Sequence, residues 1–192
     1  GPLPGNGSMV AALRHATGAV PVATGKPDPA MHRESVRRSG ARNPVVVGDR
    51  LDTDIEGANA VGCASLLVLS GVTHPVDLLS APPRQRPTFV ARDLGGLLYR
   101  HRTPVRVAGG FECGGWAVHP ESDALHLGAL PNNTAIDSSG VHGDDGLDAL
   151  RALCACAWDT DRTLAGADIR CIGDGALAAA ELARLGLDRP TG

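Results

Sequence analysis

The clearest pattern along the chain is an apolar run followed by an acidic turn and a helical stretch of small residues. Residues 45–47 are three consecutive valines that stop at Gly48, and the helical stretch runs to Gly62. An unbroken run of β-branched residues is typical of a strand buried on both faces of a parallel sheet. The pattern predicts a strand, a turn and a helix, with the turn at the carboxyl end of the strand, where such sheets bind ligands.

Comparable units flank this one. A helix with Ser8 as its N-cap is expected to end at Gly18. A short strand is expected over residues 20–23, followed by a second helix. Further apolar runs predict strands over residues 64–70 and 87–91. Strands that alternate with helices form a doubly wound α/β unit, so we expect a Rossmann-like parallel sheet whose strand-to-helix turns lie along one edge.

The pattern changes near His101. Residues 105–130 offer three short strands separated by turn residues, and a polar, Gly-rich stretch that follows is expected to be a flexible loop. Two helical stretches, residues 147–158 and 176–186, complete a small α+β tail domain, in which Asp174 is expected to cap the second helix.

Composition narrows the function classes. The 192 residues are 43% hydrophobic but only 3% aromatic, so the core must consist mainly of Ala, Val and Leu. The net charge is −3, and no basic block or apolar run of membrane-spanning length is present, which argues against nucleic-acid and membrane partners. Five cysteines without a CxxC pair argue against a disulfide framework or a structural zinc site and favour a reduced, cytoplasmic setting.

Candidate chemistry gathers at two of the predicted turns. Lys26, the only lysine of the chain, precedes one helix, while Asp49, Asp52 and Asp54 precede another. Carboxylates at a sheet edge suit a hard cation such as Mg²⁺, and a metal with a lysine offsets phosphoryl charge in a transition state. The acidic turn taken alone is explained equally well by helix capping through Thr53 or Asp54.

Three motifs together carry a resemblance: TGKPDP at residues 24–29, VVVGDRLDTDI at 45–55 and LLVLSGVTHPVDL at 66–78. This combination resembles the haloacid dehalogenase (HAD) superfamily, specifically its subfamily IIA phosphatases related to p-nitrophenyl phosphatase, phosphoglycolate phosphatase and NagD. The resemblance implies that residues 1–20 are the end of a cap domain returning to the core, that residues 21–100 are the C-terminal half of the HAD core, and that residues 101–192 are an accessory domain.

The resemblance also implies roles for particular residues. Lys26 of the GKP motif would steady the phosphoryl group and an aspartyl intermediate. Asp49 would bind Mg²⁺ directly, and Asp54 would support the metal's water shell or the lysine. Asp52 falls between these positions and is expected to be a solvated turn residue.

The family's DxDG strand, which carries the nucleophile and the general acid, is absent from these 192 residues. The chain is therefore expected to be a C-terminal portion that is inactive alone, with an exposed apolar edge that allows a homodimer. Two later segments resemble the family's motifs in part. Residues 158–164 contain a DxD with Arg162 where the family needs Gly, and residues 171–180 repeat only part of the GD motif; both are expected to be structural.

The tail resembles, more weakly, the acetyltransferase-like accessory region of actinobacterial members of this subfamily. It lacks the Q/R-x-x-G-x-G/A turn that binds acetyl-CoA. Its histidines, His101, His119, His126 and His142, are scattered along the sequence and are expected to be surface residues rather than a metal site.

These observations favour a Mg²⁺-dependent phosphatase that acts on a small phosphorylated metabolite through an aspartyl-phosphate intermediate. The alternative from a different class is a non-catalytic module that binds an anion at the lysine turn or a partner through the tail.

Overall fold

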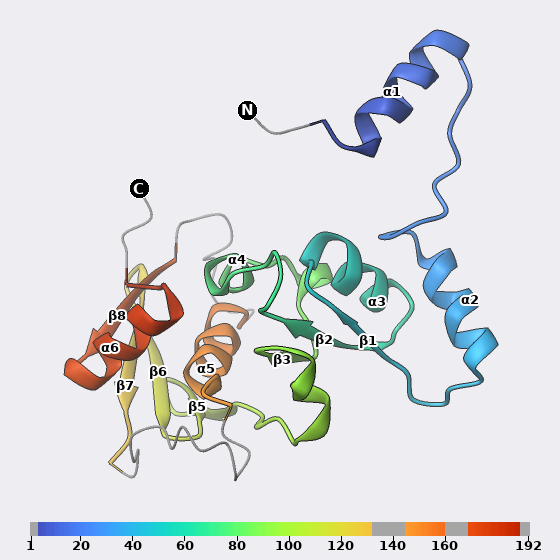
Figure 1. Cartoon of the computed structure of the whole chain (residues 1–192). Coiled ribbons are helices and arrows are strands. Elements are labelled where there is room, and N and C mark those ends of the chain that lie inside the picture. The colour runs from blue at the N-terminus through green and yellow to red at the C-terminus, as the bar shows by residue number, and fades with distance from the viewer. Residues whose placement is uncertain (1–3, 132–144, 160–168, 189–192) are drawn as a thin grey trace.

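The computed structural model describes residues 4–131, 145–159 and 169–188, and within them the chain forms two β-sheets with helix α5 between them (Figure 1). The loop expected after residue 130 and the DxD segment beyond Asp159 lie almost wholly outside the described residues. Among the described residues, no helix is long and apolar enough to cross a membrane.

The first sheet has three parallel strands in the order β1-β2-β3. Their bounds are Val45–Gly48, Ala64–Val68 and Phe89–Ala91. A π-helical turn over Leu51–Ile55 and helix α3 (Glu56–Ala60) follow β1, and α4 (Pro75–Leu79) follows β2. The parallel α/β unit predicted from the sequence is confirmed, and the ends of β1 and β2 lie along one edge, as expected.

The N-terminal elements depart from the prediction in two places. Helix α1 (Asn6–Thr17) begins before Ser8 and has Gly5 as its N-cap, whereas its end at Gly18 is as expected. The strand expected over residues 20–23 is wrong: the segment is irregular, with Val20 82% exposed and Val22 85% exposed. A strand needs a neighbour to satisfy its backbone groups, and among the described residues this segment has none.

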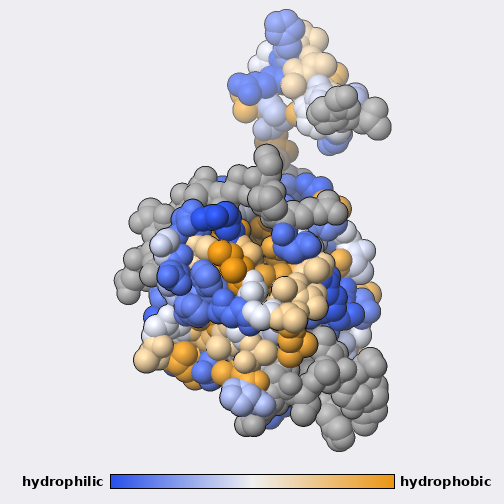
Figure 2. Space-filling model, turned by 90° about the vertical axis from the view of Figure 1, so that its left-hand side faces the viewer, coloured by the Kyte–Doolittle hydropathy of each residue, from blue (hydrophilic) through white to orange (hydrophobic). Residues whose placement is uncertain are grey.

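Helix α1 buries none of its residues and stands clear of the rest of the molecule (Figures 1 and 2). The chain rejoins the body at α2 (Pro29–Ser39), where Asp28 accepts a hydrogen bond from the Ala30 N–H at 2.8 Å. The Gly40 residue that ends this helix has a φ of 63°, a left-handed conformation that glycine adopts without strain. The N-cap at Asp28 puts Lys26 just ahead of the helix.

The second sheet has five strands in the order β4-β5-β6-β7-β8, all antiparallel except β7 and β8. Their bounds are Val105–Val107, Gly110–Cys113, Trp116–Glu121, Ala124–Ala129 and Arg170–Asp174. Helices α5 (Asp148–Ala157) and α6 (Ala176–Leu185) complete the tail. Residues 105–130, where three strands were expected, form four, and residues 170–174 add a fifth.

The expected capping role of Asp174 is wrong. This residue ends β8, its carboxylate pairs with His126, and α6 has Gly175 as an N-cap without a side-chain hydrogen bond. Pairing of β8 with β7 draws the segment into the sheet, and this long-range contact has no local signal in the sequence.

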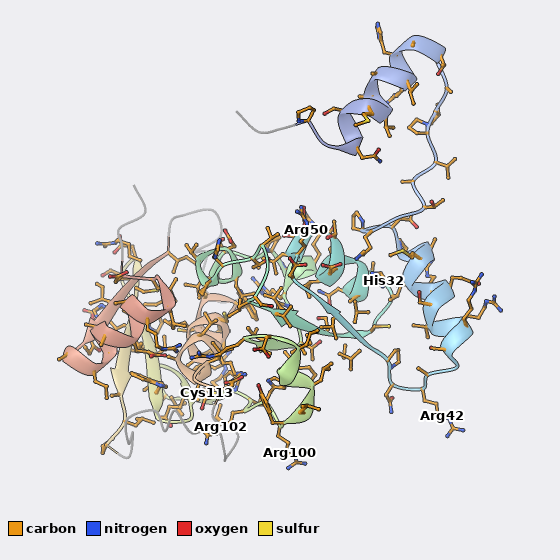
Figure 3. The ribbon with its side chains drawn as sticks, in the orientation of Figure 1. His32, Arg42, Arg50, Arg100, Arg102 and Cys113 are labelled. Carbon is orange, nitrogen blue, oxygen red and sulfur yellow. The ribbon has the colours of Figure 1, made fainter. Side chains whose placement is uncertain are left out.

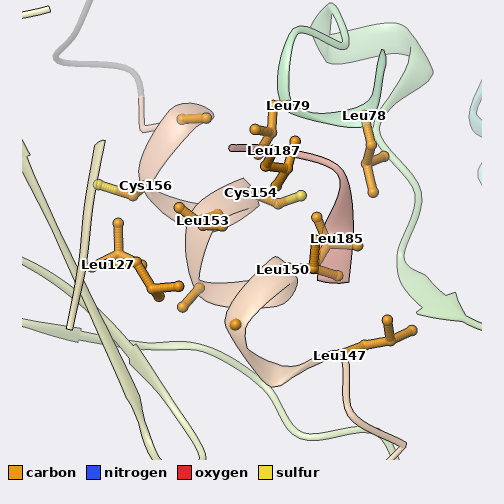
Figure 4. Packing of buried hydrophobic residues seen from close by; sticks show 14 of the residues in the cluster. Leu78, Leu79, Leu127, Leu147, Leu150, Leu153, Cys154, Cys156, Leu185 and Leu187 are labelled. Carbon is orange, nitrogen blue, oxygen red and sulfur yellow. The ribbon is translucent and has the colours of Figure 1, made fainter. Parts of the chain in front are cut away.

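One hydrophobic cluster joins the two sheets through α5. Leu150 and Leu153 of α5 are fully buried and pack in the same cluster as Leu127 of β7, Leu78 of α4 and Leu185 of α6 (Figure 4). The core is built mainly from Leu, Ala and Val, as composition predicts. All five cysteines are free.

A buried arginine makes a second connection between the sheets. Arg151 of α5 is 8% exposed and donates to Asp145 at 2.5 Å and to Asp148 at 3.0 Å. The same guanidinium donates to the Val90 carbonyl of β3 at 2.8 Å and lies 3.1 Å from His101 Nδ1. Helix α5 is therefore tied to the last strand of the first sheet by hydrogen bonds as well as by apolar packing.

We predict that Arg151→Met lowers the free energy of unfolding by about 3–5 kcal/mol, because the buried carboxylate of Asp145 loses its guanidinium partner and that of Asp148 keeps only Arg102. Urea denaturation measures the change. Arg37→Met is the matched control, since Arg37 pairs with Glu34 at a site where its side chain is 72% exposed, and it should lower the stability far less than Arg151→Met does. Equal effects of the two substitutions would contradict the assignment.

The stability that the Arg151–Asp145 pair contributes should decrease at low pH. Burial is the largest single influence and acts to raise the pKa of Asp145, but the hydrogen bonds and charge of Arg151 and the hydrogen bond from the Leu147 N–H together outweigh it, so this pKa lies below its ordinary value. The stabilisation by this pair is therefore present above an aspartate's ordinary pKa, about 3.9, and is lost as the pH falls through the lower folded-state value. Arg151→Met should remove this part of the acid sensitivity.

Candidate active site

Asp49 lies directly after β1 and is held by the loop that follows β2. Its Oδ2 accepts a hydrogen bond from the Val72 N–H at 3.0 Å. Its backbone carbonyl accepts from the Thr73 hydroxyl at 2.6 Å and from the Thr73 N–H at 3.2 Å. Both strand ends thus fix the position of Asp49, at the edge where parallel sheets bind ligands.

Lys26 and Asp54 form an ion pair at the same edge. Lys26 Nζ lies 2.5 Å from Asp54 Oδ1, with the Asp54 side chain 7% exposed and the Lys26 side chain 41% exposed. The second oxygen of Asp54 accepts from the Arg50 N–H at 3.2 Å. One end of the pair is therefore anchored in the protein, while the ammonium reaches the surface of the site.

Two glycines allow this arrangement. A Cβ at Gly48 would overlap the side chain of Asp54, and a Cβ at Gly71 would overlap the carboxylate of Asp49. Neither position has a positive φ, so the requirement at both is space rather than backbone conformation. Sequence reasoning quoted both glycines within motifs but did not identify this role.

The alternative that the acidic turn only caps a helix is not what the structure shows. Asp54 lies inside the π-helical turn over Leu51–Ile55, and neither this turn nor α3 has a side-chain N-cap bond. Asp52 is the solvated turn residue that was expected: it is exposed and pairs with Arg50 at 2.7 Å.

The electrostatic field at this turn favours cations. The hydrogen bond from Arg50 to Asp52 is the largest cause of a raised pKa at Arg50, and the charges of Asp49 and Asp54 add to it. Figure 3 shows Arg50 at the edge of the first sheet.

His32 is a residue that sequence reasoning missed. It is 8% exposed, and its ring occupies the space next to Gly57 of α3, so it packs α2 against α3 (Figure 3). Its Nε2 is buried and has no hydrogen-bond partner among the described residues. Because Lys26 precedes α2 by three residues, this packing fixes the base from which the lysine reaches Asp54.

The tail contributes no group to this cluster in the described residues. Asp159, the first carboxylate of the DxD imitation, makes a two-pronged ion pair with Arg106 at 2.6 and 2.7 Å. Asp161 and His142 lie outside the described residues. The expectation of surface histidines holds for His119, which is exposed, but is wrong for His101, whose side chain is 11% exposed. Strand pairing also brings His119 and His126 face to face, although they are apart in the sequence.

We predict that Gly71→Ala destabilises the protein by about 1–3 kcal/mol, because the added methyl group must displace the Asp49 carboxylate. Urea denaturation provides the measurement. Gly25→Ala is the control, since an added Cβ there meets nothing within 4 Å. If both variants unfold at the same urea concentration, the close approach at Gly71 is not a constraint on the site.

Comparison with known proteins supports the reading of these motifs. Residues 23–97 match the family model described as HAD-hydrolase-like. Over 159 residues the chain is 45% identical to D-glycerol 3-phosphate phosphatase of Mycobacterium tuberculosis, a match that covers 83% of this chain and 43% of that protein. It is 37% identical over 99 residues to dihydroxyacetone phosphatase of Corynebacterium glutamicum, which covers 50% of this chain and 35% of that protein.

The fold has a solved counterpart. The crystal structure of a glycerol phosphate phosphatase from Mycobacterium tuberculosis in complex with magnesium aligns with a TM-score of 0.74 and 40% identity, covering 96% of this chain and 50% of that one. The chain thus spans half or less of the length of these relatives. Residues 23–97, which include Lys26, Asp49 and Asp54, are thus similar to the HAD-like hydrolase family.

Proposed function

We propose that residues 23–97 supply part of the active site of a Mg²⁺-dependent phosphatase that hydrolyses small phosphate monoesters. The observation that supports this most is the Lys26–Asp54 ion pair at the sheet edge that also carries Asp49. A lysine and two carboxylates on a scaffold of this family suit phosphoryl transfer, in which positioning and charge stabilisation dominate.

Asp49 is the residue that we assign to Mg²⁺. Its Oδ2 is oriented by Val72, and within the described residues its Oδ1 accepts no hydrogen bond, so one oxygen remains for a hard cation. Bound Mg²⁺ would supply Lewis-acid stabilisation of phosphoryl oxygens. The magnesium-bound relative supports this assignment.

Lys26 is assigned to the phosphoryl group and Asp54 to the lysine. Held by Asp54, the Lys26 ammonium presents a compact charge that is partly open to solvent, where a phosphate oxygen can accept a hydrogen bond. Asp54 is thereby a positioning residue, because its own oxygens are engaged by Lys26 and by the backbone of Arg50.

The nucleophile must come from elsewhere. An aspartyl-phosphate intermediate requires a carboxylate in line with phosphorus, and Asp49 and Asp54 are occupied in other roles. The 192 residues contain no DxDG motif. We therefore propose that this chain alone has no phosphatase activity and that activity requires a polypeptide carrying that motif.

The names of two relatives guide the choice of substrate. D-glycerol 3-phosphate phosphatase and dihydroxyacetone phosphatase both point to three-carbon compounds, so we propose a three-carbon phosphate monoester. For the tail we propose a packing or partner-binding role without acetyl-CoA, since its sequence lacks the pyrophosphate-binding turn.

The experiment assays phosphate release from D-glycerol 3-phosphate and from p-nitrophenyl phosphate in millimolar Mg²⁺. The chain is tested alone and after refolding with the part of the Mycobacterium tuberculosis phosphatase that lies outside the match. We expect no turnover from the chain alone and measurable turnover from the mixture. In the mixture, Lys26→Ala should lower the rate at least about a hundredfold, because one preorganised charge contact is worth roughly 3 kcal/mol at a transition state.

Matched controls separate the outcomes. Lys26→Arg should rescue poorly, because a planar fork does not replace a point charge, while Arg42→Ala, in the exposed turn after α2, should leave the rate unchanged. Turnover by the chain alone that disappears in Asp159→Asn would make the DxD segment a nucleophile. A mixture that folds but stays inactive would favour the non-catalytic module.

A further inference from the structure

A second cluster of ligand-type side chains lies on the five-stranded sheet, apart from the Lys26 site. Strands β6 and β7 pair so that His119 is directly opposite His126, and their rings stack with centroids 5.1 Å apart. Glu121 is two residues beyond His119 and therefore points to the same face of the sheet. Ligand atoms of these three residues all lie within 4.8 Å of one another.

The third strand orients one of the histidines. Asp174 of β8 lies 3.0 Å from His126 Nδ1. Its register partner on β7 is Gly128, so Asp174 lies on the same face of the sheet as His126. An ionised carboxylate only accepts hydrogen bonds, so Nδ1 carries the proton and Nε2 of the neutral ring carries the lone pair.

That lone pair faces another acceptor. His126 Nε2 lies 3.8 Å from Glu121 Oε2. Two acceptors that face each other at this distance are stabilised by a positive charge between them, either a metal ion or a proton on the imidazole. With His119 beside them, one ligand atom from each of the three residues lies within 4.8 Å of the others.

The cluster is open to solvent. Helices α5 and α6 pack on the opposite face of the sheet, where Val118 and Leu127 are buried and Gly173 contacts Ala179. On the outer face, His119 and Glu121 are exposed and His126 keeps 19% of its side-chain area exposed. An ion can therefore reach all three ligands without opening the core.

We propose that His119, Glu121 and His126 bind a borderline divalent transition-metal ion of the Zn²⁺ class, with Asp174 as the residue that orients His126. Two imidazole nitrogens and one carboxylate oxygen form a set that suits Zn²⁺ better than Mg²⁺, which prefers oxygen ligands. In a tetrahedral site with zinc bonds near 2.1 Å, the ligand atoms lie about 3.4 Å apart. Here they lie within 4.8 Å of one another, so side-chain movements of about 1 Å would complete the site. A carboxylate on the second nitrogen of a ligating histidine is a recurrent support.

The test is a Zn²⁺ titration of the 192-residue chain in a thiol-free phosphine reductant, followed by calorimetry and by the NMR signals of the histidine rings. One equivalent of Zn²⁺ should shift the ring signals of His119 and His126. The affinity should fall at least tenfold in His119→Ala, in His126→Ala and in Glu121→Gln. Asp174→Asn should weaken binding by roughly 10–100-fold, the usual effect of losing such a support.

His15→Ala is the matched control, because His15 is an exposed histidine of α1, away from the sheet; its affinity for Zn²⁺ should equal that of the unsubstituted chain. Circular dichroism verifies that each variant is folded. The proposal is overturned if Zn²⁺ binds equally well to His126→Ala, as it would at the free cysteines. It is also overturned if one equivalent leaves the ring signals of His119 and His126 in place.

Discussion

The buried guanidinium of Arg151 is the constraint on which the arrangement of the two sheets depends. It joins Asp145, just before α5, and Asp148, the first residue of α5, to the carbonyl of Val90 in β3. A buried ion pair of this kind adds little net stability over apolar packing, but its geometry is directional, and removing one partner is costly. It thus favours one placement of α5 against β3, where the leucine cluster alone would tolerate others.

Order at the candidate active site follows from that placement. Strand β3 pairs with β2, and β2 with β1, so a fixed β3 fixes the loop after β2. That loop holds Asp49 through Val72 and Thr73. The lysine is held independently, by Asp54 and by the packing of His32 between α2 and α3. Two separate supports therefore converge on one edge, and the glycines at positions 48 and 71 leave the room that they need.

Local patterns in the sequence were sufficient to predict β1 and its acidic turn, because a strand-to-helix turn has its own signature. Lys26 meets this turn through Asp54, although the strand that was expected before Lys26 is absent. They failed wherever a partner distant in sequence decides the structure. Residues 20–23 have strand composition but no neighbour to pair with, and β8 exists only because β7 pairs with it. The contact of His119 with His126 could have been found, since a two-residue turn at Ser122 and Asp123 sets this register. The sequence around Arg151 did not indicate that this residue is buried, because its burial depends on contacts with Asp145 and with Val90 of β3 as well as on its place in α5.

The central claim is that Asp49, whose carboxylate is oriented by the Val72 N–H, binds the metal. A Mg²⁺ titration followed by backbone amide NMR tests this claim most directly. The account predicts that millimolar Mg²⁺ shifts the amide signals of Asp49 and Val72, and that Asp49→Asn abolishes these shifts while Asp52→Asn, at the exposed turn residue, preserves them. Weak binding is expected because one direct carboxylate ligand without substrate oxygens satisfies little of an octahedral site. Shifts that are equal in both variants, or that are absent near Val72, would contradict the account.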